Sequence, residues 1–311
     1  MGRIIGICIS EKRGTAKHEV DACEAVEGWG LKDDAHGGNW HRQISLLSYE
    51  KIEEFRARGA EVELGAFGEN LIVEGYDFRT LPVGTRFRIG EAELILTQIG
   101  KECHSHCAIY KKMGDCIMPR EGIFTRVLHG GRIQKGDEVE MIPPEKDRPF
   151  TAAVITLSDK GAAGEREDKS GSEVERLLTE AGYEVVERLL LADEQAALER
   201  QLIRLADQRQ VSVIMTTGGT GFSVRDVTPE ATIAVCDRMA NGIAEAIRAY
   251  SMTITPRAML SRAVSGIRGR TLIVNLPGSP KAVREALEFL LPSLGHGLGI
   301  LRGTEGECAR S

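Results

Sequence analysis

Hydrophobic and polar positions change their rhythm along this chain, and the change divides it into two halves. Up to residue 142, strand-length apolar runs are interrupted by glycine, as in AFGENLIVEG (66–75) and LPVGTRFRIG (81–90). Short apolar runs closed by turn residues are typical of a β-barrel or β-sandwich. We therefore predict a mostly-β barrel for residues 1–142, with one helix at Tyr49–Arg58 that Gly59 ends.

After residue 150, strand-like runs alternate with helix-like segments. TAAVITL (151–157) is a nearly continuous apolar run, which suits a strand buried on both faces. Regular strand–helix alternation predicts a mainly parallel sheet with helices on both faces, an α/β three-layer sandwich, over residues 150–303. Further strands are expected at 184–191, 211–217 and 270–276. Helices are expected from about Ser170 (the start of a capping box with Glu173), at 194–208 and at 280–291, and more than one helix is expected through about 228–253.

The segment between the halves is IPPEKDRPF (142–150), which contains three prolines and charges of alternating sign. This composition indicates an exposed linker. We place the linker at residues 143–149, and we expect residues 304–311 to form a frayed tail. The chain is thus predicted to hold two domains and a connecting segment.

Charge and composition exclude several classes of function. The formal net charge is −6, and Arg148 divides the chain into a first part with 21 basic and 25 acidic residues and a second with 19 and 21. Neither part has the basic excess of a nucleic-acid-binding surface, so an anionic ligand must be held locally. Because membrane-length apolar stretches and a secretory leader pattern are absent, we expect a cytoplasmic protein without membrane contact. Seven scattered cysteines favour free thiols over a disulfide framework.

Polar and glycine residues gather where the strands of the second half end. Since the carboxyl ends of parallel strands meet at one edge of a sheet, where ligands bind, these residues predict a site. They are Ser158, Asp159 and Asp168 after the first strand, Asp193 after the second, Gly218, Gly219, Thr220, Gly221, Asp226 and Thr228 after the third, and Asn275, Pro277, Gly278 and Ser279 after the last.

Two features of this set indicate how a ligand could be bound. The turn Gly218–Gly221 can take positive φ and can present its amides to a phosphate, although it matches neither a P-loop nor a dinucleotide fingerprint. Asp193 and Asp226 could together hold Mg²⁺, which prefers carboxylate and phosphate oxygens. An ordinary role stays open for each: Asp193 as a helix N-cap, and Asp226 in an ion pair with Arg225 or another nearby base. Thr228 and Ser279, each followed by proline, read as N-caps.

The motifs TLSD, LLADEQ, TTGGTG, RDVTPEA and NLPGSPKA together resemble those of the molybdopterin adenylyltransferase family (MogA/MoaB type) over essentially all of residues 150–303. The resemblance implies transfer of AMP from ATP to the phosphate of molybdopterin during molybdenum cofactor biosynthesis, with Mg²⁺, and assembly as a trimer or larger homo-oligomer. It matches Asp193 and Asp226 to the family's two catalytic acids. It matches Gly218–Gly221, Thr228 and Asn275–Ser279 to the ligand-binding turns.

The first half contains one segment rich in thiols, GKECHSHCAIYKKMGDC (100–116). Its cysteine spacing lacks the close pairs of a structural zinc or iron–sulfur site. Histidines and Lys101 beside the cysteines would lower a thiol pKa, so a reactive thiol fits better. A structural metal, or thiols without a role, stay open.

The same half resembles the MOSC domain, through LKDDAHGGNWHRQISLL (31–47), FGENL (67–71), the thiol segment and GDCIMPREGIFTRVLHGGRIQKGDEVEM (114–141). The resemblance implies a barrel that binds molybdenum cofactor or carries sulfur on a cysteine. Cys107 lies where that motif has its cysteine, whereas Cys103 and Cys116 are additional. His36 and Arg42 could meet anionic groups of the ligand at the barrel mouth.

We therefore predict a two-domain enzyme of molybdenum cofactor biosynthesis that takes molybdopterin and ATP and works with other proteins of that pathway. A non-catalytic carrier of molybdopterin or of the finished cofactor is the main alternative. A MOSC domain acting on unrelated thiols or N-hydroxylated compounds is a third possibility.

Overall fold

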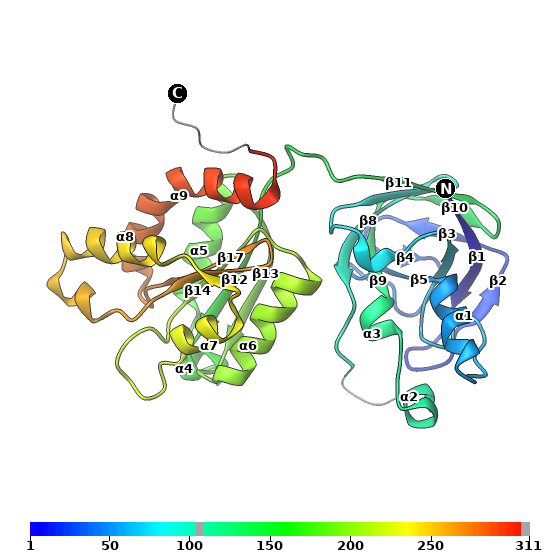
Figure 1. The fold of residues 1–311 in the computed structure, drawn as a ribbon, viewed down its shortest axis with the longest axis horizontal. Helices are drawn as coiled ribbons and strands as arrows, with labels where there is room; N and C mark the ends of the chain where they lie inside the picture. Colours follow the sequence, from blue (N-terminus) through cyan, green and yellow to red (C-terminus); the bar gives the residue numbers. More distant parts are fainter. Residues whose placement is uncertain (104–107, 306–311) are drawn as a thin grey trace. The chain divides into compact units, whose positions relative to one another are not determined.

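The computed structural model describes residues 1–103 and 108–305. The chain divides into two compact units, Met1–Glu145 and Lys146–Ser311, and the division falls inside the proline-containing segment 143–149. Figure 1 shows a β-rich first unit and a second unit that mixes helices with strands. Within the described ranges, no helix has the length and apolar character needed to span a bilayer.

The first unit contains a closed barrel of seven strands. Around the barrel they run in the order β11–β7–β8–β9–β5–β6–β1, and β1 then pairs with β11, with Gly2 opposite Val139. Closure leaves the barrel without an unpaired edge. The seven strands are β1 (Gly2–Ile9), β5 (Ile44–Ser48), β6 (Leu71–Glu74), β7 (Arg86–Ile89), β8 (Ala92–Ile99), β9 (Ile123–His129) and β11 (Glu138–Ile142).

Smaller elements surround this barrel. β2 (His18–Val20) adds to β1, and a separate sheet holds β10 (Gly131–Gln134), β3 (Ala22–Val26) and β4 (Gly30–Leu31) in that order. Gly59, at φ +91°, follows the helix predicted at Tyr49–Arg58, which extends over Tyr49–Ala57. The helical elements are α1 (Tyr49–Ala57), η1 (Phe78–Thr80), α2 (Ala108–Met113) and α3 (Met118–Glu121).

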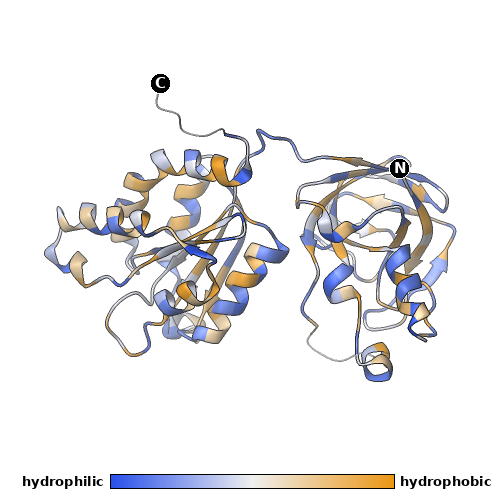
Figure 2. Ribbon diagram, viewed as in Figure 1, coloured by the Kyte–Doolittle hydropathy of each residue, from blue (hydrophilic) through white to orange (hydrophobic). Residues whose placement is uncertain are grey.

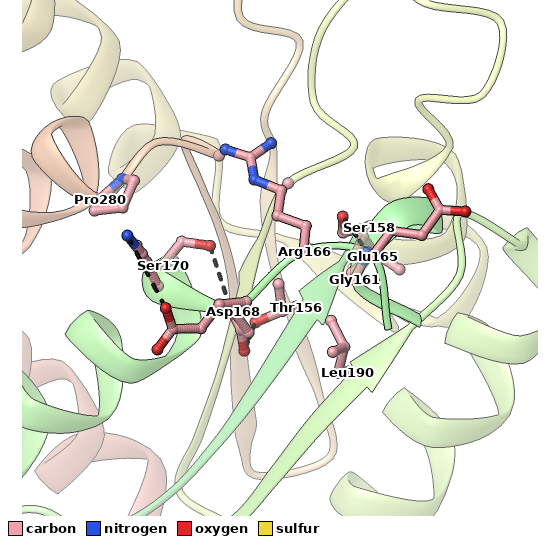
Figure 3. A pocket seen from close by; sticks show the side chains of 14 residues that line it. Thr156, Ser158, Gly161, Glu165, Arg166, Asp168, Ser170, Leu190 and Pro280 are labelled. Carbon is pink, nitrogen blue, oxygen red and sulfur yellow. Dashed lines mark hydrogen bonds and ion pairs between the residues drawn. The ribbon is translucent and has the colours of Figure 1, made fainter. Parts of the chain in front are cut away.

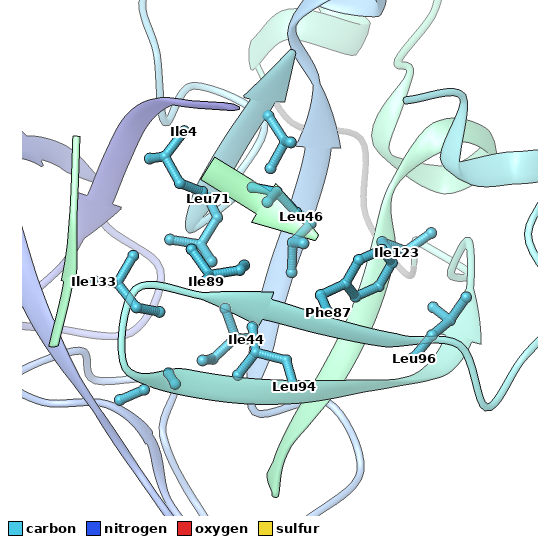
Figure 4. Close-up of a cluster of buried hydrophobic side chains, with 14 of the residues drawn as sticks. Ile4, Ile44, Leu46, Leu71, Phe87, Ile89, Leu94, Leu96, Ile123 and Ile133 are labelled. Carbon is cyan, nitrogen blue, oxygen red and sulfur yellow. The ribbon is translucent and has the colours of Figure 1, made fainter. Parts of the chain in front are cut away.

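The barrel core follows from the period-two pattern of its strands. In β8, alternate residues Ala92, Leu94 and Leu96 are fully buried, and the residues between them are only partly buried. Figure 4 shows their neighbours Ile44, Phe87 and Ile123 in the same cluster. The first unit therefore has its own hydrophobic core.

The second unit is built on a six-stranded sheet in the order β13–β12–β14–β17–β16–β15. The first four strands are parallel, and the last two pair antiparallel. Strands predicted at 151–157 and 184–191 lie at those residues, whereas the short strand β16 and the edge strand β15 beside it were not predicted. The strands are β12 (Thr151–Leu157), β13 (Glu184–Leu191), β14 (Val213–Thr217), β15 (Arg238–Met239), β16 (Ser265–Arg268) and β17 (Thr271–Leu276).

Helices cover both faces of this sheet (Figure 1). One hydrophobic cluster joins the sheet to α5 (Lys169–Glu180), α8 (Asn241–Met252) and α9 (Pro280–Arg302), and another joins it to α6 (Gln195–Ile203) and α7 (Thr228–Val235). Figure 2 shows hydrophobic residues along the strands between these layers. The remaining helical elements are α4 (Asp159–Ala162), η2 (Arg204–Gln208) and η3 (Pro256–Leu260).

Three helix boundaries differ from the predictions. α5 begins at Lys169, because the Asp168 carboxylate caps it by accepting from Gly171 N at 2.8 Å, so the cap predicted at Ser170 is wrong. α7 begins at Thr228 itself, so Thr228 is not the N-cap. α9 continues past Pro292, since Leu290, Leu294 and Leu298 extend its buried face. The cap predicted at Ser279 is confirmed, because its Oγ accepts from Ala282 N.

Candidate functional site

The ends of β12 and β13 in the second domain are joined by a reciprocal contact. The Asp159 amide donates to Asp193 Oδ2, and the Asp193 amide donates to Asp159 Oδ1, both at 3.0 Å. The ends of β14 and β17 meet where the Thr217 hydroxyl donates to the Pro277 carbonyl at 2.7 Å. The sheet therefore brings together residues that are far apart in the sequence.

The glycine turn after β14 has room for no side chain at its first two positions. Gly218 and Gly219 have φ values of +93° and +63°, a region that favours glycine. A Cβ at Gly218 would lie 2.3 Å from the Leu157 carbonyl oxygen, and one at Gly219 would lie 2.4 Å from Thr228 Oγ1. The Thr228 hydroxyl donates to Gly218 O at 2.9 Å and holds the turn in place. Thr228 thus supports the turn from a fully buried position.

The two acids approach neighbouring residues of this turn. A Cβ at Gly219 would lie 3.2 Å from Asp193 Oδ1, and a Cβ at Gly221 would lie 2.9 Å from Asp226 Oδ2. Burial raises the pKa of Asp193, and the negative charges of Asp159 and Asp226 raise it further. The two carboxylates thus lie along one turn, beside Gly219 and Gly221.

Neither ordinary role considered for these acids matches the structure. Glu194, not Asp193, stands at the N-cap of α6. Arg225 forms its ion pairs with Asp159 and Glu194, both at 2.9 Å, rather than with Asp226. The Asp226 carboxylate instead accepts from Ser223 N at 2.9 Å, within its own turn.

The donor set fits a magnesium ion that is shared with a substrate. Over residues 1–103 and 108–305, the structure groups no three histidine, cysteine, aspartate or glutamate side chains as a metal cage. Mg²⁺ commonly takes only one or two carboxylates and completes its coordination with water and phosphate oxygens. Asp193 and Asp226 can supply the carboxylate part of such a set.

A pocket of about 530 Å³ adjoins the glycine turn (Figure 3). Its wall combines groups of both charges, so a polar ligand with an anionic part can find partners along it. The basic residues are Arg166 and Lys169, and the acids beside them are Glu165 and Glu167. Four of the predicted binding residues also line the pocket, namely Ser158, Asp168, Gly218 and Gly278.

Two of these lining residues also stabilise the pocket wall. Asp168 caps α5 with one carboxylate oxygen and accepts from the Thr156 hydroxyl at 2.9 Å with the other. Ser158 Oγ accepts from Gly161 N at 3.1 Å and caps α4. Both side chains therefore shape the pocket as well as facing it.

Asn275 does not face the pocket, contrary to our expectation of a ligand contact. It is fully buried, and its Nδ2 donates to the Thr216 and Thr232 hydroxyls, both at 2.9 Å. Its Oδ1 accepts from Val264 N at 3.2 Å. Asn275 thus joins β17 to β14 and α7 from inside the domain. Thr220 is also buried, and its carbonyl accepts from Arg262 N at 2.9 Å.

Replacement of Asn275 by alanine should therefore lower stability rather than act on a ligand contact. It removes three hydrogen bonds and leaves buried polar partners unsatisfied, so we expect the free energy of unfolding to fall by about 2–4 kcal/mol. Urea unfolding of the full chain measures this change. Ser279→Ala, which removes an exposed cap, is the comparison and should cost only about 1 kcal/mol. Equal, small losses in the two variants would contradict the buried role of Asn275.

Arg262 supports the site, although the sequence did not predict this role. Arg262 donates through Nε to Gly221 O at 2.7 Å and through Nη2 to Asp226 O at 2.5 Å, and it pairs with Glu230. Its guanidinium thereby holds both ends of the turn that carries Asp226. The sequence gives no local signal for this role, because Arg262 lies far along the chain from the turn.

The first domain has a second candidate site, a pocket of about 570 Å³. Lys17, His36, Lys101, Cys103 and Cys116 are among the residues that line it. The pocket therefore brings His36 together with two of the thiols. Cys107 lies outside the described residues. Arg42 does not line this pocket; its guanidinium lies 4.7 Å from the ring centroid of Trp40.

A buried network supports the pocket wall. The Asp34 carboxylate is 1% exposed and accepts from Lys17 Nζ and Asn70 Nδ2, both at 2.9 Å. Burial raises the pKa of Asp34, but these hydrogen bonds outweigh it and the net shift of the pKa is downward. His36 Nδ1 lies 3.3 Å from Ser10 Oγ, and burial lowers the His36 pKa, so the ring is mainly neutral at pH 7.

Comparison with known proteins gives a separate match for each domain. Residues 33–140 match the MOSC domain model, and residues 153–296 match the model of a probable molybdopterin binding domain. The Helicobacter pylori (strain ATCC 700392 / 26695) molybdopterin adenylyltransferase is 40% identical over 152 residues, which cover 48% of this chain and 86% of that protein. The Escherichia coli (strain K12) molybdopterin adenylyltransferase is 44% identical over 146 residues, which cover 46% of this chain and 74% of that protein.

Among solved structures, the molybdopterin biosynthesis enzyme MoaB of Thermus thermophilus is similar to this chain with 45% identity and a TM-score of 0.48. The match covers 50% of this chain and 97% of that one.

Proposed function

Because the chain belongs to the molybdopterin adenylyltransferase family through its second domain and carries a MOSC domain as its first, we propose that it adenylylates molybdopterin during molybdenum cofactor biosynthesis. The observation that carries this proposal is the convergence of Asp193 and Asp226 on the Gly218–Gly221 turn, beside a pocket. A carrier protein would need the pocket but not the two acids.

The reaction requires little acid–base catalysis by the protein. The phosphate of molybdopterin is already an anion, and its oxygen attacks the α-phosphorus of ATP. A phosphorus–oxygen bond forms to the acceptor while the bond to pyrophosphate breaks. Catalysis then rests on positioning and on neutralising the phosphate charge. In our proposal the amides of the glycine turn face the phosphate oxygens, and Asp193 and Asp226 hold Mg²⁺, which supplies charge neutralisation.

We assign the 530 Å³ pocket to molybdopterin. Its volume lies within the range of small-molecule sites, about 300–1,000 Å³. Hydroxyl, carboxylate and basic groups along the wall suit the polar edge of a pterin and its phosphate. ATP would then approach from the side of the turn where the two acids lie.

Pyrophosphate release tests this assignment. The full chain, incubated with ATP, molybdopterin and Mg²⁺, should release pyrophosphate in proportion to the adenylylated pterin that forms. Omission of molybdopterin is the control and should abolish the release. Tight pterin binding without any release would contradict the enzyme and support the carrier.

For the first domain we propose that it binds the cofactor or carries sulfur for it, with Cys107 as the reacting thiol. Lys101 lines the pocket of this domain together with Cys103 and Cys116, which supports an anionic ligand beside thiols. Mass spectrometry of the purified full chain should find one additional sulfur atom on Cys107, or a co-purified pterin, and Cys107→Ser should lose the added sulfur. An unmodified Cys107 in a chain without pterin would contradict this role. Activity on N-hydroxylated compounds would instead support a MOSC domain that acts on substrates unrelated to the cofactor.

We also propose that the second domain assembles as a homotrimer, as the resemblance implies. Exposed apolar side chains of Met252, Met259 and Leu260 near α8 and η3 support self-association. Light scattering during size-exclusion chromatography gives the mass in solution. A monomer across the working concentration range would contradict the assembly.

A further inference from the structure

One arginine connects the turn of Asp226 to the ends of two other strands. Arg225 precedes Asp226 directly, yet its Nε and Nη2 donate to the two carboxylate oxygens of Asp159 at 3.0 and 2.9 Å. Nη2 also donates to Glu194 Oε1 at 2.9 Å. A single side chain therefore spans from the turn after β14 to the residues after β12 and β13.

Asp159 continues this connection to the second acid. Its amide donates to Asp193 Oδ2, and its Oδ1 accepts from the Asp193 amide, both at 3.0 Å. A continuous series of contacts thus runs from the Asp226 backbone through Arg225 and Asp159 to the Asp193 carboxylate.

We propose that Arg225 and Asp159 are positioning residues that set the separation and orientation of Asp193 and Asp226. The inference rests on the proposed adenylyl transfer, since it names residues that act through those two acids. A purely stabilising role does not account for the arrangement, because about half of each side chain of Arg225 and Asp159 is exposed and exposed ion pairs add little stability. A guanidinium that donates to both oxygens of a carboxylate instead fixes the orientation of that carboxylate.

The full-length variants Arg225→Gln and Asp159→Ala test the proposal by kinetics. Residues that orient the ligands of a catalytic ion typically cost about 10- to 100-fold in activity when removed, and we expect a loss of this size in kcat. KM for ATP and molybdopterin should change little. Because both residues act in one series, the double variant should be no slower than the slower single one. Arg225→Lys should recover part of the lost kcat, because lysine keeps the positive charge but cannot donate from two nitrogens to one carboxylate.

Arg188→Gln is the matched control. Arg188 forms a similarly exposed ion pair with Glu175 in the same domain and should retain wild-type kcat when replaced. If the double variant loses kcat by the product of the two single losses, or if the control loses as much kcat as the single variants, the proposal is overturned.

Hydrogen exchange provides a readout that does not depend on activity. In the ligand-free protein, the amides of Asp159 and Asp193 should exchange faster in Arg225→Gln than in the wild type, because the residue that holds Asp159 is gone. Unchanged exchange at both amides would overturn the inference. If the wild type transfers no AMP, the proposed function fails, and the exchange rates still decide whether Arg225 positions Asp193.

Discussion

Alanine at position 226 should abolish most adenylyl transfer by the full chain while molybdopterin still binds. The Asp226 carboxylate lies beside Gly221, and its negative charge raises the pKa of Asp193, so the variant removes half of the proposed cation site. Loss of one group that stabilises transition-state charge typically costs about 10²- to 10³-fold, and we expect kcat to fall by at least this factor. Initial rates of pyrophosphate release measure kcat, and pterin fluorescence measures binding.

Asp207→Ala is the control for this variant. It removes an acid of the same domain that pairs with Arg268 and lies outside the predicted motifs, so turnover should stay close to wild type. Turnover by Asp226→Ala at the wild-type rate would exclude the assigned role. Loss of pterin binding together with turnover would show that Asp226 also shapes the pocket.

The second large effect is expected for Gly218→Ala. The substitution forces a side chain into a positive-φ position and places its Cβ 2.3 Å from the Leu157 carbonyl oxygen. Strain in the left-handed region and overpacking against backbone together should cost about 2–4 kcal/mol of unfolding free energy. The turn must shift to relieve the contact, so its amides leave the phosphate and transfer should also fail. Urea unfolding and pyrophosphate release measure the two losses.

Gly182→Ala separates the two contributions. Gly182 has a φ of +85°, close to that of Gly218, but a Cβ there would meet nothing within 4 Å. This variant should lose only the strain, about 1 kcal/mol, and should keep its activity. Equal destabilisation of the two variants would contradict the steric role of Leu157.

The strands and their ends could be predicted from the sequence because a parallel sheet buried on both faces leaves unmistakable apolar runs. The run at 151–157 coincides with β12, which is buried on both faces. The strand predicted at 184–191 coincides with β13, an edge strand in which charged residues interrupt the apolar ones and none is buried. Strand direction then places Ser158, Asp193 and Gly218 at one edge without any knowledge of side chains. The resemblance to known families adds the chemistry, but not which side chains face the ligand.

Side-chain direction was the part that the sequence could not supply. Asn275 belongs to the same motif as Gly278, yet it is buried among the hydroxyls of Thr216 and Thr232. Arg262 supports the Asp226 turn by backbone carbonyls, which leave no mark on the sequence. In the first domain, Lys17 lies just before β2 and Asp34 lies after β4, and their buried ion pair has no local signal in the sequence.

Closure of the barrel makes its first and last strands neighbours, since Gly2 lies opposite Val139. Directly opposed residues of an antiparallel pair are separated by only about 5 Å, so a loop of a few residues can join them. The barrel is therefore suited to circular permutation: its order along the chain could start at another surface turn while every strand keeps both partners.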